Sequence, residues 1–310
     1  MLLSGKYGSG KSVLSLAVAK TLIERGEPVI YVDADMPLRV VDERLEKSGL
    51  KSKLGTDFFY LHRSKCNMKI GDEKWCQFLA SMKGKRHHVI ILVNLKDLMP
   101  AKMNLNLDAD SMFIMNELKT LRDFGHTVQL LHHWGRDGGL ENPFKNSASI
   151  GDAVDVGYTI QKDEDGARFV LHRFKDRFPV KTSLAFEVSD NFELVEVLTP
   201  EFEKMIDDMK LIHETMRKLQ SEGVEVHQDN LIERLRGILS KNRIITLLPM
   251  GENKIWDVSR GNRKTLVYKP RSLKLQKSDP NYRRVFGILE NCELEEGRDE
   301  AFEESLPEFL

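Results

Sequence analysis

The sequence has few cysteines and no long apolar run. Its three cysteines, Cys66, Cys76 and Cys292, form neither a C-x-x-C pair nor the spacing of a zinc finger. This pattern argues against a disulfide framework and a structural zinc site, and it fits a reducing compartment. No apolar run approaches the roughly 18 residues that a membrane span requires, and residues 1–3 are too short to be a signal peptide. The sequence therefore predicts a cytoplasmic protein without a membrane partner.

The chain also lacks an excess of charge of either sign. It has 47 Lys and Arg against 48 Asp and Glu in 310 residues, a formal net charge of −1. This balance excludes a uniformly basic nucleic-acid-binding protein, but it hides an uneven distribution. Nine Lys or Arg and one acidic residue lie between Arg260 and Arg284, whereas nine Asp or Glu and one Arg lie between Glu290 and Glu308. We expect a basic segment followed by an acidic, flexible tail.

One glycine-rich stretch near the start carries a specific chemical signal. Residues 5–12, Gly-Lys-Tyr-Gly-Ser-Gly-Lys-Ser, fit the P-loop pattern G-x-x-x-x-G-K-[ST] and run directly into an apolar helix-forming segment. Backbone N–H groups of such a loop point into one concavity at a helix N-terminus, which suits phosphate. Lys11 would reach the β- and γ-phosphates of ATP, and the Ser12 hydroxyl would bind Mg²⁺. The expected nucleotide-binding residues are Gly5, Gly8, Ser9, Gly10, Lys11 and Ser12.

Strand and helix patterns alternate after this loop. Buried strands are expected at 28–32, 58–61, 88–93 and 127–131, and helices at 37–50, 73–82 and 111–124. The segments 167–173 and 184–188 alternate like an antiparallel hairpin at a sheet edge. This order predicts a three-layer α/β sandwich with a mainly parallel sheet. P-loop folds normally have a longer first strand, so the abrupt start suggests a fragment or a late start codon.

The order of the expected elements changes at Pro200, from alternating strands and helices to consecutive helices. Helices are expected at 202–220 and 230–239, a short helix or turn at 241–248, and strands at 254–258 and 265–268. Helices followed by a hairpin with a basic tip outline a winged helix, a module that binds DNA or docks proteins. Phosphate contacts would fall on the wing tip, namely Arg260, Arg263 and Lys264. We expect an ATPase domain at 1–195, a winged-helix-like domain at 196–275 and a tail at 276–310.

A P-loop ATPase needs a carboxylate that positions or activates water. The run Val29–Asp35 follows the P-loop helix directly, and in this place it resembles the second strand of RecA-like ATPases, which ends in the catalytic glutamate. The resemblance implies that Asp35, one methylene shorter than glutamate, takes this role, with Asp33 as a substitute. A solvated carboxylate pair at a strand end is the alternative interpretation.

The end of the strand expected at 127–131 resembles one subgroup of that family. Leu130–Trp134 is similar to the L-H-H element of RepA-type ATPases, the hexameric plasmid and phage replicative helicases. The resemblance implies that His133 is a γ-phosphate sensor, whereas a buried structural histidine pair is the alternative. The Gly-rich loop Gly135–Lys145 would contact DNA, and residues 144–155 are similar to the subgroup's R-G-S-x-x-[IL]-x-D-A-x-D stretch.

A later basic pair implies assembly. Lys175 and Arg177 resemble the K-x-R pair that RecA-like helicases insert into the ATP site of a neighbouring subunit. Such an arginine finger stabilises charge on the transferred phosphoryl group, so the resemblance implies a homo-oligomeric ring or filament, for example a hexamer. A charged turn is the alternative interpretation.

The sequence departs from the family at the strand that should help to hold Mg²⁺. Residues 93–98, Val-Asn-Leu-Lys-Asp-Leu, resemble the pattern D-[PSN]-L-x-x-L, but Val93 stands where an Asp is expected. Valine accepts no hydrogen bond from a Mg²⁺-bound water. The expected metal ligands are therefore Ser12 with Asp33 or Asp97, or Asp35. The departure at Val93 argues against ATP turnover more than against ATP binding.

Together these features predict a RecA-like P-loop sandwich followed by a small winged helix. The predicted function is that of an ATP-binding and ATP-hydrolysing, DNA-associated, RepA-like motor related to helicases in plasmid, phage or mobile-element replication. Two alternatives stay open. One is a ParA/MinD-like partition switch ATPase, since Lys6 occupies the place of that family's signature lysine although Tyr7 departs from its pattern. The other is a degenerate nucleotide-bound adaptor, disabled by Val93, that binds DNA or a protein.

Overall fold

The computed structural model describes residues 1–105, 107–134, 148–163, 166–260 and 265–271. Three predicted features lie outside these residues: the loop Gly135–Lys145, the wing-tip side chains of Arg263 and Lys264, and the tail 276–310. The chain divides into two compact units, Met1–Thr199 and Pro200–Leu310. Each unit is described by itself.

A nine-stranded sheet organises the N-terminal unit, counting the described residues. Its strands are β1 (Leu2–Gly5), β2 (Val29–Asp33), β3 (Phe58–His62), β4 (Val89–Val93), β5 (Thr127–His133), β6 (Val156–Lys162), β7 (Arg168–Asp176), β8 (Ser183–Val188) and β9 (Leu194–Val197). They lie in the order β3-β2-β4-β5-β1-β6-β7-β8-β9, and neighbouring strands from β3 to β6 run parallel. The last three strands are antiparallel.

The strand order decides which side chains can meet. Strand β5 lies between β1 and β4, so its end is next to the P-loop. In register, His133 lies opposite Gly5, and Asp33 of β2 lies opposite Val93 of β4. Because the carboxyl ends of parallel strands share one edge of a sheet, the predicted site residues of four strands converge there.

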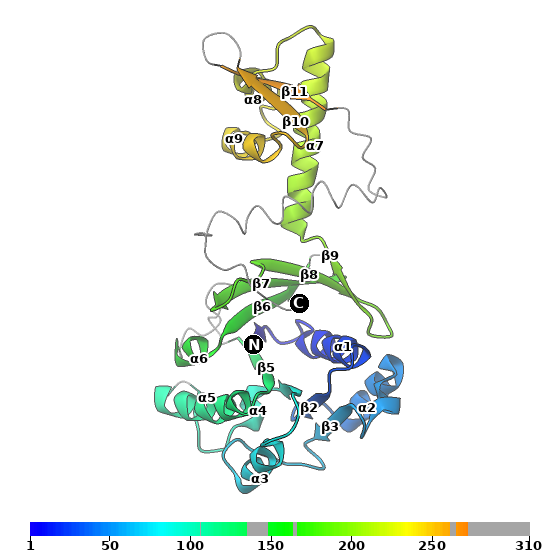
Figure 1. Ribbon diagram of the computed structural model, residues 1–310, viewed down its shortest axis with the longest axis vertical. Helices are drawn as coiled ribbons and strands as arrows, with labels where there is room; N and C mark the ends of the chain where they lie inside the picture. Colours follow the sequence, from blue (N-terminus) through cyan, green and yellow to red (C-terminus); the bar gives the residue numbers. More distant parts are fainter. Residues whose placement is uncertain (106, 135–147, 164–165, 261–264, 272–310) are drawn as a thin grey trace. The chain divides into compact units, whose positions relative to one another are not determined.

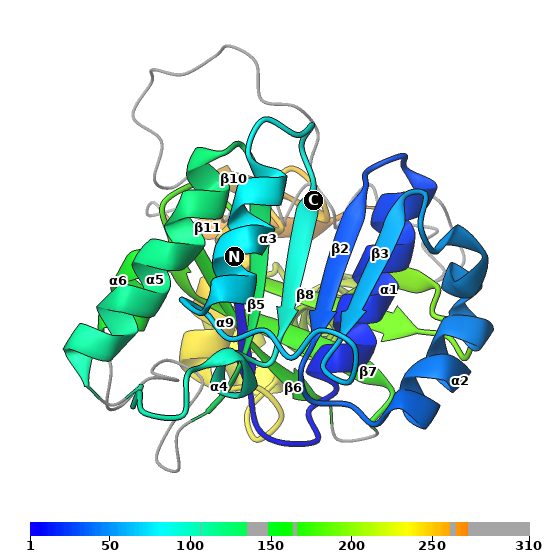
Figure 2. The same cartoon turned by 90° about the horizontal axis from the view of Figure 1, so that it is seen from below.

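The two faces of the sheet are covered by different helices (Figure 2). Alternate residues such as Ile30 and Ile90 join a core with α3 (Glu73–Met82), α5 (Asp108–Asp123) and α6 (Ala148–Ala153). The residues between them, such as Tyr31 and Ile91, join a core with α1 (Lys11–Glu24) and α2 (Leu38–Ser48). This is the period-two alternation of a sheet that is buried on both faces, and it confirms the predicted three-layer sandwich.

Four elements differ from the sequence prediction. The β7–β8 pair is not the edge of the sheet, because the short strand β9 adds to β8. A four-residue strand that reads Leu-Val-Glu-Val is too short to stand out, as is usual for edges. Helix α5 begins at Asp108, where two acidic residues in its first turn favour the helix dipole. The short helix α4 (Leu95–Leu98) follows β4 and the 3-10 turn η1 (Leu50–Lys53) follows α2.

In the part of the C-terminal unit that the structure describes, three helices accompany a hairpin (Figure 1). Its elements are α7 (Pro200–Ser221), α8 (Gln228–Arg234), α9 (Lys241–Met250), β10 (Trp256–Arg260) and β11 (Leu266–Pro270). The hairpin is antiparallel, with Arg260 opposite Leu266. Trp256 is fully buried, and its indole N–H donates to the Leu248 carbonyl at 2.9 Å. None of the helices among the described residues has the length and apolar character of a membrane span.

Candidate nucleotide-binding site

The P-loop connects the end of β1 to the start of α1, and its shape requires glycine at two points. Gly10 has φ of 83°, and a Cβ added there would lie 2.2 Å from Phe169 Cε1. A Cβ on Gly5 would lie 2.8 Å from the Ile160 carbonyl oxygen. Gly8, with φ of 78°, faces open space. The loop therefore has the left-handed turns and the close backbone approaches for which the motif selects glycine.

Lys11 is the cation of this loop, and it is almost completely buried. Its side-chain ammonium donates to the carbonyl oxygens of Gly5 (3.0 Å) and Lys6 (2.8 Å), and weakly to Ser9 Oγ (3.4 Å). Burial lowers the pKa of Lys11 to about 8, against the opposing effect of the nearby Asp35 carboxylate. The loop thus holds its own cation on acceptors that phosphate oxygens can replace, which fits an anionic ligand.

Asp33 is buried at the end of β2, and its carboxylate is fully engaged. Oδ1 accepts hydrogen bonds from the backbone N–H groups of Asp35 (2.9 Å) and Met36 (3.0 Å), and Oδ2 accepts one from the Tyr60 hydroxyl. Burial and this charge raise the pKa of Tyr60. A cavity of only about 10 Å³, bounded by Ser12 and Asp33 among others, is the size of one water. A metal-binding role for Asp33 would require it to give up bonds that shape the β2–α2 turn.

Asp35 and Asp97 are half-buried near the loop. Both raise the pKa of His133 against burial and Lys11, which lower it. The Asp97 carboxylate accepts from the side-chain amide of Asn94 at 3.0 Å. Val93, which stands where the family pattern has an Asp, is 1% exposed within the apolar core under α1 and α2. This position is therefore shielded from water. Among the described residues, no three His, Cys, Asp or Glu side chains form a metal cluster by themselves.

His133 and its neighbours close the site on the β5 side. The Trp134 backbone N–H donates to the Gly5 carbonyl at 3.1 Å, which ties the end of β5 to the start of the loop. The Tyr7 and His133 rings are 5.9 Å apart, and the Lys6 ammonium lies 5.6 Å from the Trp134 ring centre. Burial lowers the pKa of His133, so its imidazole is neutral at pH 7. Burial also lowers the pKa of His132, to about 4.

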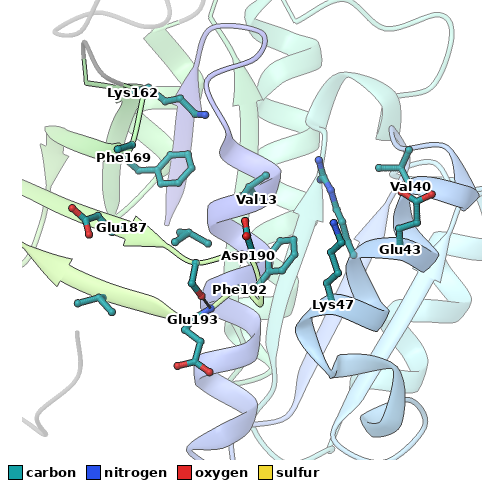
Figure 3. A pocket seen from close by; sticks show the side chains of 16 residues that line it. Val13, Val40, Glu43, Lys47, Lys162, Phe169, Glu187, Asp190, Phe192 and Glu193 are labelled. Atoms are coloured by element: carbon teal, nitrogen blue, oxygen red, sulfur yellow. Dashed lines mark hydrogen bonds between the residues drawn. The ribbon is translucent and has the colours of Figure 1, made fainter.

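A cavity of about 760 Å³ lies beside the start of α1 (Figure 3). Val13 and Phe169, which touches Gly10, form its wall next to the P-loop. Phe192 of the β8–β9 turn, which packs in the core with α1 and α2, lines it as well (Figure 3). The hairpin that carries Phe192 is held on α1 by Lys20, which donates to Asn191 O at 3.0 Å and to Glu193 Oε1 at 3.3 Å. Apolar and aromatic walls with a charged rim are typical of a site for a flat heterocycle.

Polar residues of several elements complete this cavity. The charged or polar lining side chains are Glu43, Arg44, Lys47, Lys162, Glu187, Ser189, Asp190 and Glu193. Sequence reasoning did not find this cavity, because its walls come from α1, α2, the β6–β7 connection and the β8–β9 turn. The sequence predicts a strand that contains Phe169, but only the register of this strand with β6 shows that the Phe169 ring lies at the cavity.

Lys175 and Arg177 lie far from the P-loop of their own chain. Phe169 touches Gly10, but Arg177, which directly follows the end of β7, is eight residues further along the chain. This separation corresponds to roughly 25 Å at the usual rise per strand residue. Lys175 pairs with Gly157 at the start of β6, the opposite edge of the sheet. Arg177 donates to Asp155 Oδ1 (3.0 Å) and to the Asp152 carbonyl (2.8 Å). The two cations therefore cannot serve their own loop.

Of the predicted nucleic-acid contacts, one lies among the described residues. Arg260 is the last residue of β10, and its side chain is exposed. Arg263 and Lys264 lie outside the described part of the chain. The exposed surface of α9 carries Lys241, Asn242 and Thr246, which sequence reasoning did not single out.

No known protein family and no curated protein sequence matches this chain. Its structure is similar to a solved domain described as an ATPase domain, with a TM-score of 0.53 and 14% identity over 64% of this chain and 84% of that chain. It is also similar to a DnaB-like replicative helicase described with its interactions with primase, with a TM-score of 0.51 and 16% identity over 64% of this chain and 57% of that chain. The sheet and its helices have a RecA-like P-loop fold.

The likeness is one of fold. The chain spans little more than half of the DnaB-like helicase. A flagellar accessory protein, FlaH from Methanocaldococcus jannaschii, has a TM-score of 0.45 and 13% identity over 64% of this chain and 88% of that chain. The sequence prediction of a RecA-like ATPase fold is confirmed, whereas the RepA-type subgroup and the winged helix stay predictions.

Proposed function

We propose that the chain is an ATP-binding and ATP-hydrolysing motor that acts on DNA in plasmid, phage or mobile-element replication and is related to helicases. One observation carries the proposal: the buried ammonium of Lys11 is held by the loop's own oxygen atoms at the junction of β1 and α1. This junction lies beside a cavity whose walls suit a nucleobase. A cation and a base-sized cavity at one P-loop are what a nucleoside triphosphate requires.

In this proposal the base and ribose occupy the cavity of Figure 3, with Phe192 against the base. The phosphates then lie along residues 5–12, and Lys11 exchanges its bonds to Gly5 and Lys6 for phosphate oxygens. A bound Mg²⁺ would neutralise charge on the phosphates, and the Ser12 hydroxyl is the residue that would hold it. Replacing Phe192 by Ala should weaken nucleotide binding, whereas Phe192→Tyr should retain it.

Hydrolysis in this proposal depends on Asp35 and His133. The Asp35 carboxylate orients the attacking water and accepts its proton, and the neutral His133 imidazole hydrogen-bonds to the terminal phosphate. The influence of Asp35 on the pKa values of Lys11 and His133 supports this arrangement, because it requires the three groups to be near each other. Asp35→Asn should then abolish turnover and leave ATP binding intact.

Lys175 and Arg177 are proposed to act on the ATP of a neighbouring subunit. Their distance from their own loop supports this, since they are at the opposite edge of the sheet. In an assembly, Arg177 would leave Asp155 and reach the phosphates of its neighbour, where it stabilises transition-state charge. A head-to-tail arrangement of this kind closes into a ring or extends as a filament.

Mixing two inactive variants tests this intersubunit site. Lys11→Ala removes the P-loop cation and Arg177→Ala removes the finger, so each variant alone should be inactive. In a mixture, about a quarter of the interfaces, by random pairing, would combine an intact loop with an intact finger. We expect the mixture to regain activity. Activity that stays absent, with subunits that associate only as nucleotide-dependent dimers, would favour the partition-switch alternative.

We propose that DNA binds to the C-terminal unit as to a winged helix. Exposed Lys241, Asn242 and Thr246 on α9 would enter a groove, and Arg260 with the wing tip would contact phosphates. Replacing Arg260 by Ala should weaken binding to all sequences about equally and reduce its salt dependence. A change confined to some sequences would contradict a phosphate contact.

A second candidate function is supported by Val93. Its burial in an apolar core leaves β4 without a carboxylate beside Mg²⁺, so the chain would hold ATP without turnover and serve as a DNA-bound adaptor. The two candidates differ in one observable: hydrolysis that DNA stimulates belongs only to the motor.

A further inference from the structure

Two aromatic side chains of the N-terminal unit are far more exposed than a folded protein normally leaves them. Tyr7 is 90% exposed and Phe178 is 61% exposed, and they are the two most exposed aromatic side chains in the described part of the chain. Exposed large aromatics are enriched at protein interfaces, where they act as anchors. An interface with another molecule would bury both side chains.

The positions of these residues relate them to one reaction. Tyr7 belongs to the P-loop, between Gly5 and Lys11, and its ring lies against His133. Phe178 directly follows Arg177, so the two Cα atoms are about 3.8 Å apart. The P-loop and the end of β7 are at opposite edges of one sheet. Hence the two aromatics cannot meet within a subunit, but they can meet between two subunits placed head to tail.

The turn that carries Phe178 is held firmly. The Arg173 guanidinium donates to the Val180 carbonyl at 2.5 Å, and the Arg173 backbone N–H donates to the Thr182 carbonyl at 2.8 Å. The Tyr158 hydroxyl donates to the Lys181 carbonyl at 2.8 Å. A turn fixed in this way loses little conformational entropy when it docks, which favours its use as a contact element.

We propose that Phe178 of one subunit docks against Tyr7 of the next, and that this contact positions Arg177 at the neighbour's phosphates. The inference rests on the proposed intersubunit ATP site and names the partner of its surface: a second copy of this chain. Phe178 directly follows Arg177, so a finger that reaches phosphates held by residues 5–12 also brings Phe178 toward the neighbour's loop. The two aromatic rings then cover each other, and water is excluded from the finger.

Disulfide trapping tests the contact directly. The natural cysteines are first replaced in a Cys66→Ser, Cys76→Ser, Cys292→Ser background, and Tyr7→Cys is combined with Phe178→Cys. With a non-hydrolysed ATP analogue and mild oxidation, we expect a ladder of covalent multimers on a non-reducing gel. A matched control combines Phe178→Cys with Met112→Cys, which is 56% exposed on α5 and should give no ladder.

A cysteine-free measurement complements the trapping. Phe178→Ala should lower the association constant of subunits by at least about 30-fold, the usual effect of removing an interface anchor. Phe178→Tyr should retain assembly. Nucleotide binding, followed with a fluorescent ATP analogue, should be unchanged in Phe178→Ala, because the residue is far from its own loop.

The outcomes separate this inference from the proposed function. Multimers with bound nucleotide but no Tyr7–Phe178 ladder would overturn the contact and leave the motor intact. A covalent dimer from Tyr7→Cys alone would mean a two-fold symmetric interface and would overturn the head-to-tail contact. Absence of nucleotide binding would overturn both proposals together.

Discussion

Gly10→Ala should destabilise the N-terminal unit more than Gly8→Ala, although both glycines have a positive φ. Gly10 combines φ of 83° with a Cβ position 2.2 Å from Phe169 Cε1. Placing a non-glycine residue in the left-handed region costs about 1–2 kcal/mol. Forcing a well-packed aromatic ring aside adds about 1–3 kcal/mol. The expected loss of unfolding free energy is therefore about 2–5 kcal/mol.

Gly8→Ala provides the matched control. Gly8 has φ of 78°, but its Cβ would meet nothing within 4 Å. Only the conformational cost of about 1–2 kcal/mol should remain. The difference between the two variants isolates the contact with Phe169, and it should vanish when both are compared in a Phe169→Ala background. Binding of ATP should also fall more in Gly10→Ala, because Phe169 walls the base-sized cavity.

Urea unfolding followed by tryptophan fluorescence measures these energies. Trp256 is in the C-terminal unit, so a Trp256→Phe background leaves Trp75 and Trp134 as reporters of the N-terminal unit. Equal stability losses for Gly8→Ala and Gly10→Ala would refute the close contact between the loop and the cavity wall. So would a difference that persists without the Phe169 ring.

Three further predictions concern charge at the site. Because burial lowers the pKa of Lys11 to about 8 from 10.5 and phosphate charge would restore it, ATP binding between these pH values should take up a proton, but not at pH 6.5. A calorimetric binding enthalpy at about pH 9 that is the same in buffers of different ionisation enthalpy would contradict this. Asp33→Ala should lower the unfolding free energy by about 3 kcal/mol or more, because two backbone N–H groups and the Tyr60 hydroxyl lose their charged acceptor; unchanged stability without nucleotide would contradict a structural role. Val93→Asp should lower the melting temperature without ligand, because it buries a carboxylate in an apolar core, and Mg²⁺ with ATP should recover part of the loss; an equal melting temperature with and without ligand would show that no metal comes near β4.

The parts of the site that depend on neighbouring residues were predictable from sequence. The P-loop has a fixed spacing and lies between a strand and a helix, so its place in the fold follows from local pattern alone. The buried strands β2 and β4 read as apolar runs, because both faces of the sheet are covered. In each case the residues that identify the feature lie within a single loop or strand.

The rest depends on contacts between distant segments. The sequence predicts Asp33 as a metal ligand or catalytic substitute, and this stays a prediction. The sequence does not show that Tyr60, 27 residues away, donates a hydrogen bond to the Asp33 carboxylate. The proximity of His133 to Gly5 follows from β5 lying next to β1, which no local pattern specifies. The base-sized cavity joins four segments, and Phe192 enters it from a turn that resembled an ordinary loop.

ATP hydrolysis with and without single-stranded DNA is the measurement that tests the central claim most directly, made on the natural chain beside Lys11→Ala and Arg177→Ala. The account predicts turnover that DNA stimulates and that both substitutions abolish, with ATP binding lost only in Lys11→Ala. An ATP hydrolysis rate that is the same with and without DNA would contradict an intersubunit DNA motor. Hydrolysis by Arg177→Ala at the rate of the natural chain would contradict it as well. Tight ATP binding by the natural chain without any turnover would contradict it equally, and would make Val93 the decisive residue of a nucleotide-bound adaptor.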